Sequence, residues 1–218
     1  MERYITVTIV IELLCFVVSV YFLSRDKSPI WKSAIVFLLI TVIVEILGRH
    51  YNITNQFKKN SQIYNLLTIP ECMFISGMFY MCLREYKVSG WLMIAGLALV
   101  FGFYLSEIAR HGIYDYMNTT TTLMSVVFSF YGFLYLFLLI RGDDYVVLKT
   151  HTPFWWITGS LIYYFGGLAV GLLFSVLNLK GHLNSRLYTY IYMALNILMY
   201  AFWSYSFRCR YHQRKSNN

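Results

Sequence analysis

The chain has 218 residues, of which 58% are hydrophobic and only 13% are charged, and its mean hydropathy is +0.55. This composition excludes an ordinary soluble domain, because soluble domains carry about 25% charged residues. The net charge of +8 does not indicate direct binding of nucleic acid, because the basic residues flank long apolar runs and form no basic domain.

Seven apolar segments predict transmembrane helices, because a helix of about 20 residues crosses a hydrocarbon core of roughly 30 Å. The first segment has no signal-peptide cleavage site and ends in "YFLSRDK", so we expect a true helix there. The connections are too short for an extramembrane domain. The expected fold class is therefore all-α: a compact bundle of seven transmembrane helices over residues 1–208, followed by a basic cytoplasmic tail at 209–218 that is expected to fray. The predicted helices cover residues 4–23, 32–51, 62–83, 90–108, 119–140, 154–177 and 187–207.

Lysine and arginine are unevenly distributed over the two ends of these helices. The larger share of the 18 falls in the first, third and fifth connections and in the tail. Cytoplasmic loops of membrane proteins are enriched in these two residues. The pattern predicts an N-terminus outside and a C-terminus inside, in a multi-pass protein of the bacterial cytoplasmic (inner) membrane.

Three carboxylates, Glu12, Glu45 and Glu71, lie inside apolar segments, in the middle or the outer half of the predicted bundle. A charge is costly in lipid, so each should face the bundle interior or a wet cavity. Arg49 follows Glu45 by one helical turn and is predicted to pair with it. Gly48, between them, should let a neighbouring helix come close. These groups form either a structural cluster that orients the helices or a site for a cation, a proton or a ligand.

The third predicted helix contains a proline next to one of these acids. Pro70 precedes Glu71 and predicts a kink there, because proline removes a backbone hydrogen bond. Tyr64, Thr68 and Glu71 share one face of this helix. Such a bend occurs at binding cavities and equally as a packing device.

The last predicted helix carries a polar stripe at steps of four residues. The stripe either makes hydrogen bonds between helices or lines a ligand site. Its members are Tyr188, Tyr192, Asn196 and Tyr200. Small residues in the preceding helix are interpreted as packing contacts; they are Gly159, Gly167 and Gly171.

The balance of motifs is against an enzyme, and no cofactor is expected. No helix carries the HxxxH or HExxH pair of zinc-dependent hydrolases, and the last helix has no buried lysine that would bind retinal. Three histidines map to the outer ends of helices, near Glu107 and Asp115, and are weak candidates for a metal site. They are His50, His111 and His182.

Four stretches carry a family resemblance: "EILGR" at 45–49, "YNLLTIPE" at 64–71, "PFWWITGSLIYYFGG" at 153–167 and "LNILMYAFWSYSFRC" at 195–209. They resemble a family of small bacterial (Bacteroidetes-type) seven-span membrane proteins, sometimes encoded near sensor kinases. The resemblance implies no activity and no catalytic residue. The positions that coincide with the family pattern are Glu45, Gly48, Asn65, Glu71, Phe154, Trp155, Asn196 and Tyr200.

The leading interpretation is a non-enzymatic sensory or signalling module that binds a small ligand or a partner through a polar cluster in its outer half. One alternative is a proton- or cation-coupled transporter or channel, suggested by the three acids. Another is an accessory membrane effector, such as a component of a defence system. Expected partners are the lipid bilayer and a membrane protein, either a sensor kinase or a second copy of the chain. The candidate ligand- or ion-binding residues are Glu12, Glu45, Arg49, Asn65, Glu71, Tyr192, Asn196 and Tyr200.

Overall fold

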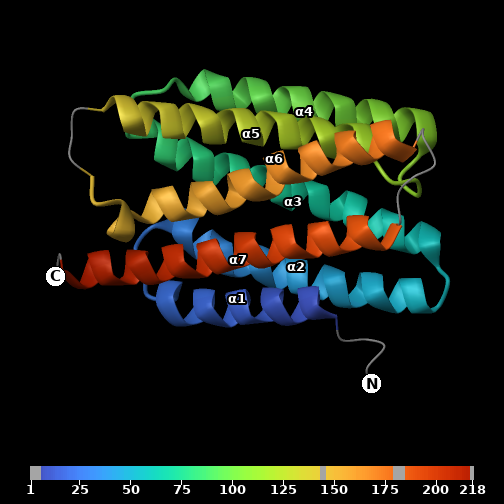
Figure 1. The fold of residues 1–218 in the computed structure, drawn as a ribbon, viewed down its shortest axis with the longest axis horizontal. Helices are drawn as coiled ribbons and strands as arrows, with labels where there is room; N and C mark the ends of the chain where they lie inside the picture. The colour runs from blue at the N-terminus through green and yellow to red at the C-terminus, as the bar shows by residue number, and fades with distance from the viewer. Residues whose placement is uncertain (1–5, 143–145, 179–184, 217–218) are drawn as a thin grey trace. The chain divides into compact units, whose positions relative to one another are not determined.

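The computed structural model describes residues 6–142, 146–178 and 185–216, which form seven α-helices and one short 3-10 turn (Figure 1). The predicted all-α class and the number of helices are confirmed for this part of the chain. The elements are α1 (Val7–Leu23), α2 (Pro29–Ile53), α3 (Phe57–Arg84), α4 (Gly90–His111), α5 (Asn118–Arg141), the 3-10 turn η1 (Leu148–Thr150), α6 (Thr152–Asn178) and α7 (Ser185–Ser216).

Five of the described helices, α2 to α6, are long and apolar enough to cross a membrane. Helix α1 is apolar but has 17 residues, and α7 is diluted by tyrosines, by Asn196 and by its basic end. The chain is therefore a polytopic membrane protein. That α1 and α7 also cross the bilayer, and that the N-terminus lies outside, stay predictions.

Local sequence signals explain where several helices begin and end. Pro29 starts α2, before the predicted start at residue 32, because proline needs no hydrogen-bond acceptor in the first turn. The side chain of Asp26 accepts a hydrogen bond from the backbone N–H of Ser28 (2.8 Å) and orders the approach to this helix. Helix α4 ends where Gly112 follows it. Gly112 has φ +76°, a conformation that favours glycine and terminates the helix.

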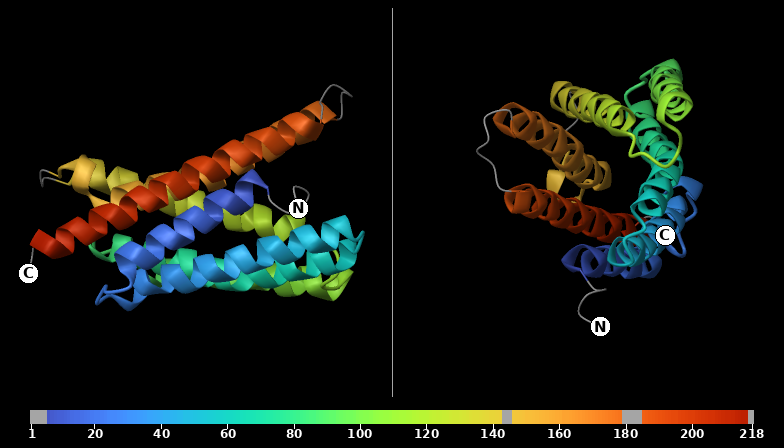
Figure 2. Two further views of the ribbon diagram at one scale, coloured as in Figure 1. Left: turned by 90° about the horizontal axis from the view of Figure 1, so that it is seen from below. Right: turned by 90° about the vertical axis from the view of Figure 1, so that its right-hand side faces the viewer.

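The first of two compact units covers residues 1–124. Its helices are neighbours in chain order: α1 packs on α2, α2 on α3, and α3 on α4 (Figure 2). The rings of Phe37 in α2 and Phe74 in α3 stack with their centroids 4.5 Å apart. Leu38 and Ile75 are fully buried in the same core. The apolar contact between α2 and α3 thus fixes the positions of the polar groups that these helices carry.

The second unit covers residues 125–218, and α6 and α7 pack along each other within it. Trp156 and Trp203 stack with ring centroids 5.4 Å apart, and both are fully buried. The indole N–H of Trp203 donates to the hydroxyl of Ser160 (3.1 Å). Gly159 lies in this contact, in agreement with its interpretation as a packing residue.

The basic end of the chain is helical, which corrects the expectation of a frayed tail. Helix α7 continues to Ser216 because its last turns are bound to the segment before α6. The side-chain amide of Gln213 donates to the carbonyl oxygen of Thr150 (3.0 Å) and accepts from the hydroxyl of Thr152 (2.9 Å). The hydroxyl of Ser206 donates to the carbonyl oxygen of Thr152 (2.9 Å).

We predict that Gly159→Ala destabilises the protein while Gly171→Ala, on the same helix, does not. A Cβ at position 159 would lie 2.7 Å from Cβ of Phe202 and 3.1 Å from the carbonyl oxygen of Met199, so α6 and α7 would have to separate. Overpacking of this kind costs about 1–3 kcal/mol. A Cβ at position 171 would make only an ordinary contact, 3.9 Å from the hydroxyl oxygen of Tyr192. Thermal unfolding in detergent measures both; equal melting temperatures for the two variants would contradict the prediction.

Candidate functional site

Helices α1, α2 and α3 bring together two of the three predicted acids and one tyrosine. The hydroxyl of Tyr64 in α3 is hydrogen-bonded to the carboxylate of Glu45 in α2. The carboxylate of Glu12 in α1 lies close enough to interact electrostatically with the same hydroxyl, and Glu12 is only 2% exposed. We call these three residues the acid cluster. It presents several oxygen acceptors within apolar helices, an arrangement that suits a cation, a proton or a hydrogen-bond donor.

Gly48 explains how the tyrosine reaches the acid. A Cβ at this position would lie 2.7 Å from the hydroxyl oxygen of Tyr64 and 2.8 Å from a ring carbon. It would also lie 3.0 Å from the side-chain oxygen of Asn60. The expectation that Gly48 admits a neighbouring helix is therefore confirmed, and the group admitted is the ring of Tyr64. Sequence reasoning placed Tyr64 on the face of α3 that holds Glu71 but missed its bond to Glu45.

Arg49 and Glu71 lie on the same two helices, and both are partly exposed. Arg49 is one turn beyond Glu45 in α2, and the predicted ion pair between them stays a prediction. Glu71 lies seven residues after Tyr64 in α3, roughly 10 Å along the helix axis, and interacts electrostatically with Cys72. Pro70 lies inside the continuous helix α3.

Asn65 holds a turn of the backbone in place. Its amide nitrogen donates to the carbonyl oxygens of Ile113 (2.8 Å) and Asp115 (2.7 Å), and its side-chain oxygen accepts from the N–H of Met117 (3.3 Å). The hydroxyl of Tyr104 donates to the carbonyl oxygen of Asn65 (3.2 Å). These bonds give Asn65, which the resemblance had added to the candidate ligand residues, a structural role in the α4–α5 connection.

The polar stripe of α7 makes contacts within the second unit. The hydroxyl of Tyr192 donates to the carbonyl oxygen of Gly167 in α6 (2.9 Å). The amide of Asn196 donates to the carbonyl oxygen of Tyr192, in its own helix (3.1 Å). Tyr200 is 4% exposed and meets the ring of Trp203 edge-on, with centroids 5.8 Å apart. These contacts favour interhelical hydrogen bonding and packing, the first of the two interpretations of the stripe.

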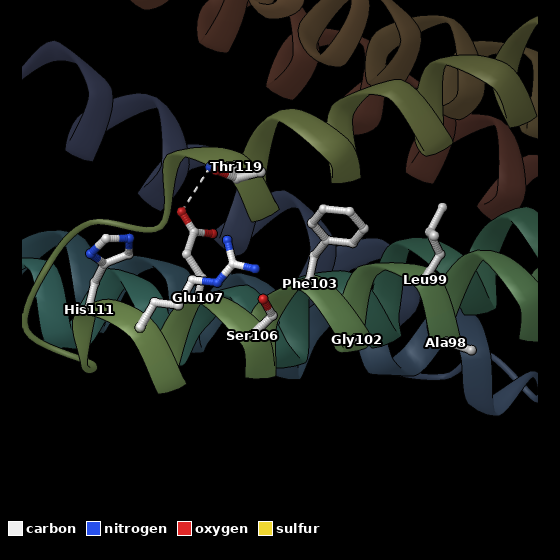
Figure 3. Close-up of a pocket in the computed structure, with 9 residues that line it drawn as sticks. Ala98, Leu99, Gly102, Phe103, Ser106, Glu107, His111 and Thr119 are labelled. Atoms are coloured by element: carbon white, nitrogen blue, oxygen red, sulfur yellow. Dashed lines mark hydrogen bonds between the residues drawn. The ribbon is translucent and has the colours of Figure 1, made fainter.

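A second polar group lies at the end of α4, where Glu107 caps α5 (Figure 3). One carboxylate oxygen accepts from the N–H of Thr119 (3.1 Å), and the other accepts from the N–H (2.9 Å) and the hydroxyl (2.7 Å) of Thr120. A carboxylate at a helix N-terminus satisfies free N–H groups and the positive end of the helix dipole. A cavity of about 380 Å³ adjoins Glu107, and His111 and Arg110 line it. Sequence analysis did not predict this cap, although the run of threonines that opens α5 could have indicated it.

The weak metal candidates do not assemble in the part of the chain that the structure describes. Within residues 6–142, 146–178 and 185–216, no group of three or more His, Cys, Asp or Glu side chains is placed to hold a metal ion. His50 lies in the last turn of α2, and His111 is the last residue of α4. His182 lies outside the described residues.

Comparisons with protein-family models, with curated proteins and with solved structures each give no match. The resemblance to the bacterial seven-span family is therefore carried by the four sequence stretches alone. The chemistry of the acid cluster is the remaining guide to function.

We predict that Gly48→Ala destabilises the protein through Tyr64. The added methyl group must displace the tyrosine ring, at a cost of about 1–3 kcal/mol, and weakens its bond to Glu45. In a Tyr64→Ala background the ring is absent, so Gly48→Ala should lower the free energy of unfolding by less. A double-mutant cycle should therefore give an interaction energy between the two positions of at least about 0.5 kcal/mol. Gly77→Ala is the control, since a Cβ there meets nothing within 4 Å. Additive effects of Gly48→Ala and Tyr64→Ala on thermal unfolding would contradict the contact.

Proposed function

We propose that this protein is a non-enzymatic sensory or signalling module of a membrane, and that the acid cluster is its ligand site. The observation that carries the proposal is a carboxylate of α2 bonded to a tyrosine hydroxyl of α3, both in membrane-length helices, with the buried carboxylate of Glu12 in the apolar helix α1 close to the same hydroxyl. Ionisable groups inside a membrane are expensive, and they mark binding sites or ion pathways.

The composition of the cluster indicates which ligand it takes. Glu12, Glu45 and Tyr64 supply carboxylate and hydroxyl oxygens that attract positive charge and accept hydrogen bonds. The matching ligand is a small organic cation, or a cationic group on a partner protein. The proposed partner is a sensor kinase, which the resemblance alone suggests, or a second copy of the chain.

Small organic cations test this site directly. Tetramethylammonium, choline and spermidine chlorides are added to the purified protein at constant ionic strength, and thermal unfolding is followed. A ligand at 100 times its Kd stabilises by about 2.7 kcal/mol, so we expect at least one cation to raise the melting temperature. Glu45→Gln and Tyr64→Phe should remove the rise. Glu85→Gln, the same chemical change at the exposed C-terminal cap of α3, should preserve it.

Three results would contradict the ligand site. They are no stabilisation by any of the cations, equal stabilisation of the wild type and Glu45→Gln, or loss of the rise in Glu85→Gln as well. Glu71→Gln extends the test, since loss of the rise there would place the acid beside Pro70 in the same site.

A proton- or cation-coupled transporter is the second candidate, and the burial of Glu12 favours it. A carboxyl that is 2% exposed and lies near the Tyr64 hydroxyl can take up and release a proton away from bulk water. Proton entry into proteoliposomes under an imposed potential separates the two functions. Flux that Glu12→Gln abolishes supports transport, and its absence supports the ligand-binding module.

We further propose the orientation in which the N-terminus is outside and the C-terminus is inside a bacterial cytoplasmic membrane. The distribution of Lys and Arg supports it. Alkaline phosphatase fused after residue 218 should be inactive, because it folds only in the periplasm, whereas green fluorescent protein at the same point should fluoresce. Active phosphatase there would reverse the orientation.

A further inference from the structure

The backbone carbonyl of Lys149 joins the last turns of α7 to the start of α6. Its oxygen accepts hydrogen bonds from the indole N–H of Trp155 (3.2 Å), the hydroxyl of Tyr205 (3.2 Å) and the thiol of Cys209 (3.7 Å). Three donors from two helices thus fix the 3-10 turn η1 in position. The side chain of Lys149 is exposed, so its charge is accessible on a turn whose backbone is fixed.

A cavity of about 570 Å³ lies where this turn meets α7. Its volume is in the range of small-molecule and cofactor sites, roughly 300–1,000 Å³. Basic residues dominate its lining, since Lys149, Arg208 and His212 border the same space. Among the described residues that line it, none is acidic. The lining residues are Lys149, Thr150, Tyr205, Arg208, Cys209, His212 and Gln213.

The charges around this cavity come from few residues. His151 adjoins the turn, but its imidazole is hydrogen-bonded to the Tyr135 hydroxyl (2.8 Å), and burial lowers its pKa. It is therefore neutral near pH 7 and adds no charge. The cations of the cavity are Lys149 and Arg208, which makes them the two side chains to test.

The helices place the cavity at the level of lipid headgroups. The membrane-length part of α6 begins at Thr152, directly after the turn, so Lys149 lies just outside the apolar span. The basic end of α7 lies beside the start of α6 (Figure 1). Trp155 and Tyr205 meet edge-on at this level, with centroids 4.7 Å apart, and aromatic residues of this kind gather at membrane interfaces.

We propose that this cavity binds the phosphate of an anionic phospholipid headgroup. Lysine and arginine both bind phosphate, arginine through two parallel hydrogen bonds. Basic pockets between membrane helices at the headgroup level attract anionic lipids. The tyrosine hydroxyl and the glutamine amide beside the cations supply polar partners for a glycerol headgroup. This site uses no residue of the acid cluster and is independent of the function proposed above.

Native mass spectrometry of the full chain in a neutral detergent tests the proposal. The probes are phosphatidylglycerol and phosphatidylcholine with identical acyl chains. We expect the wild type to retain phosphatidylglycerol in preference to phosphatidylcholine. Each basic residue near a membrane surface contributes about a five-fold change in affinity for anionic lipid, so Lys149→Gln with Arg208→Gln should weaken phosphatidylglycerol binding roughly 25-fold. Both positions are exposed, and the Lys149 carbonyl bonds remain in the variant.

A matched control separates a defined site from general attraction to a basic surface. Arg141→Gln with Lys215→Gln removes the same charge from two exposed residues that do not line the cavity, and should leave binding unchanged. Lys149→Arg with Arg208→Lys keeps the charges and should keep most of the binding. If the double variant folds poorly, Lys149→Gln and Arg208→Gln are tested singly, and each should weaken phosphatidylglycerol binding about five-fold.

Several results would overturn the proposal. Equal losses in the cavity and control variants would show diffuse attraction only. Equal retention of the two lipids by the wild type would remove the selectivity for an anion. Inorganic phosphate or glycerol 3-phosphate binding as tightly as the lipid, and with the same dependence on Lys149 and Arg208, would assign the cavity to a soluble phosphate compound.

Discussion

A bilayer offers no water to a polar group among the lipid tails, so the protein itself must satisfy every amide, hydroxyl and carboxyl there. Asn65 and Glu107 satisfy polar backbone groups in the same way where two helices end, at the α4–α5 connection. The amide of Asn65 binds two carbonyl oxygens and one N–H of the connecting turn. The carboxylate of Glu107 binds two N–H groups in the first turn of α5. Together they satisfy the backbone where one helix has ended and the next begins.

The same constraint accounts for the partner of Glu45. The hydroxyl of Tyr64 on the adjacent helix reaches the carboxylate of Glu45 without bringing a further charge into the membrane. Such an arrangement requires a close approach, which Gly48 provides by having no side chain. In the second unit, the hydroxyl of Tyr192 likewise reaches across to the backbone carbonyl of a glycine, Gly167. Glycine on one helix and tyrosine on the other is thus a recurring way of placing a hydroxyl between helices here.

Much of the fold was predictable because lipid imposes long apolar segments. The predicted helix ends were wrong where a proline in the first turn or a contact far along the chain determines the end of a helix. Pro29 extends α2 by starting it early, and Gln213 extends α7 by binding the segment before α6. Glu12 and Glu45 were identifiable as costly residues in apolar runs. The role of Asn65 was not, because its three partners lie far along the chain and only tertiary packing brings them within reach.

This separation along the chain means that Asn65 is synthesised well before its hydrogen-bond partners. The partners of the Asn65 amide follow it by 48, 50 and 52 residues. A ribosome adding about 5–20 residues per second needs on the order of three to ten seconds to deliver them. The rest of α3 and all of α4 are made during this interval, in which the amide of Asn65 needs water or the insertion machinery as a temporary partner. The bonds to Ile113, Asp115 and Met117 can all close only after residue 117 has left the ribosome, so the tie between α3 and the α4–α5 connection forms late compared with the synthesis of Asn65.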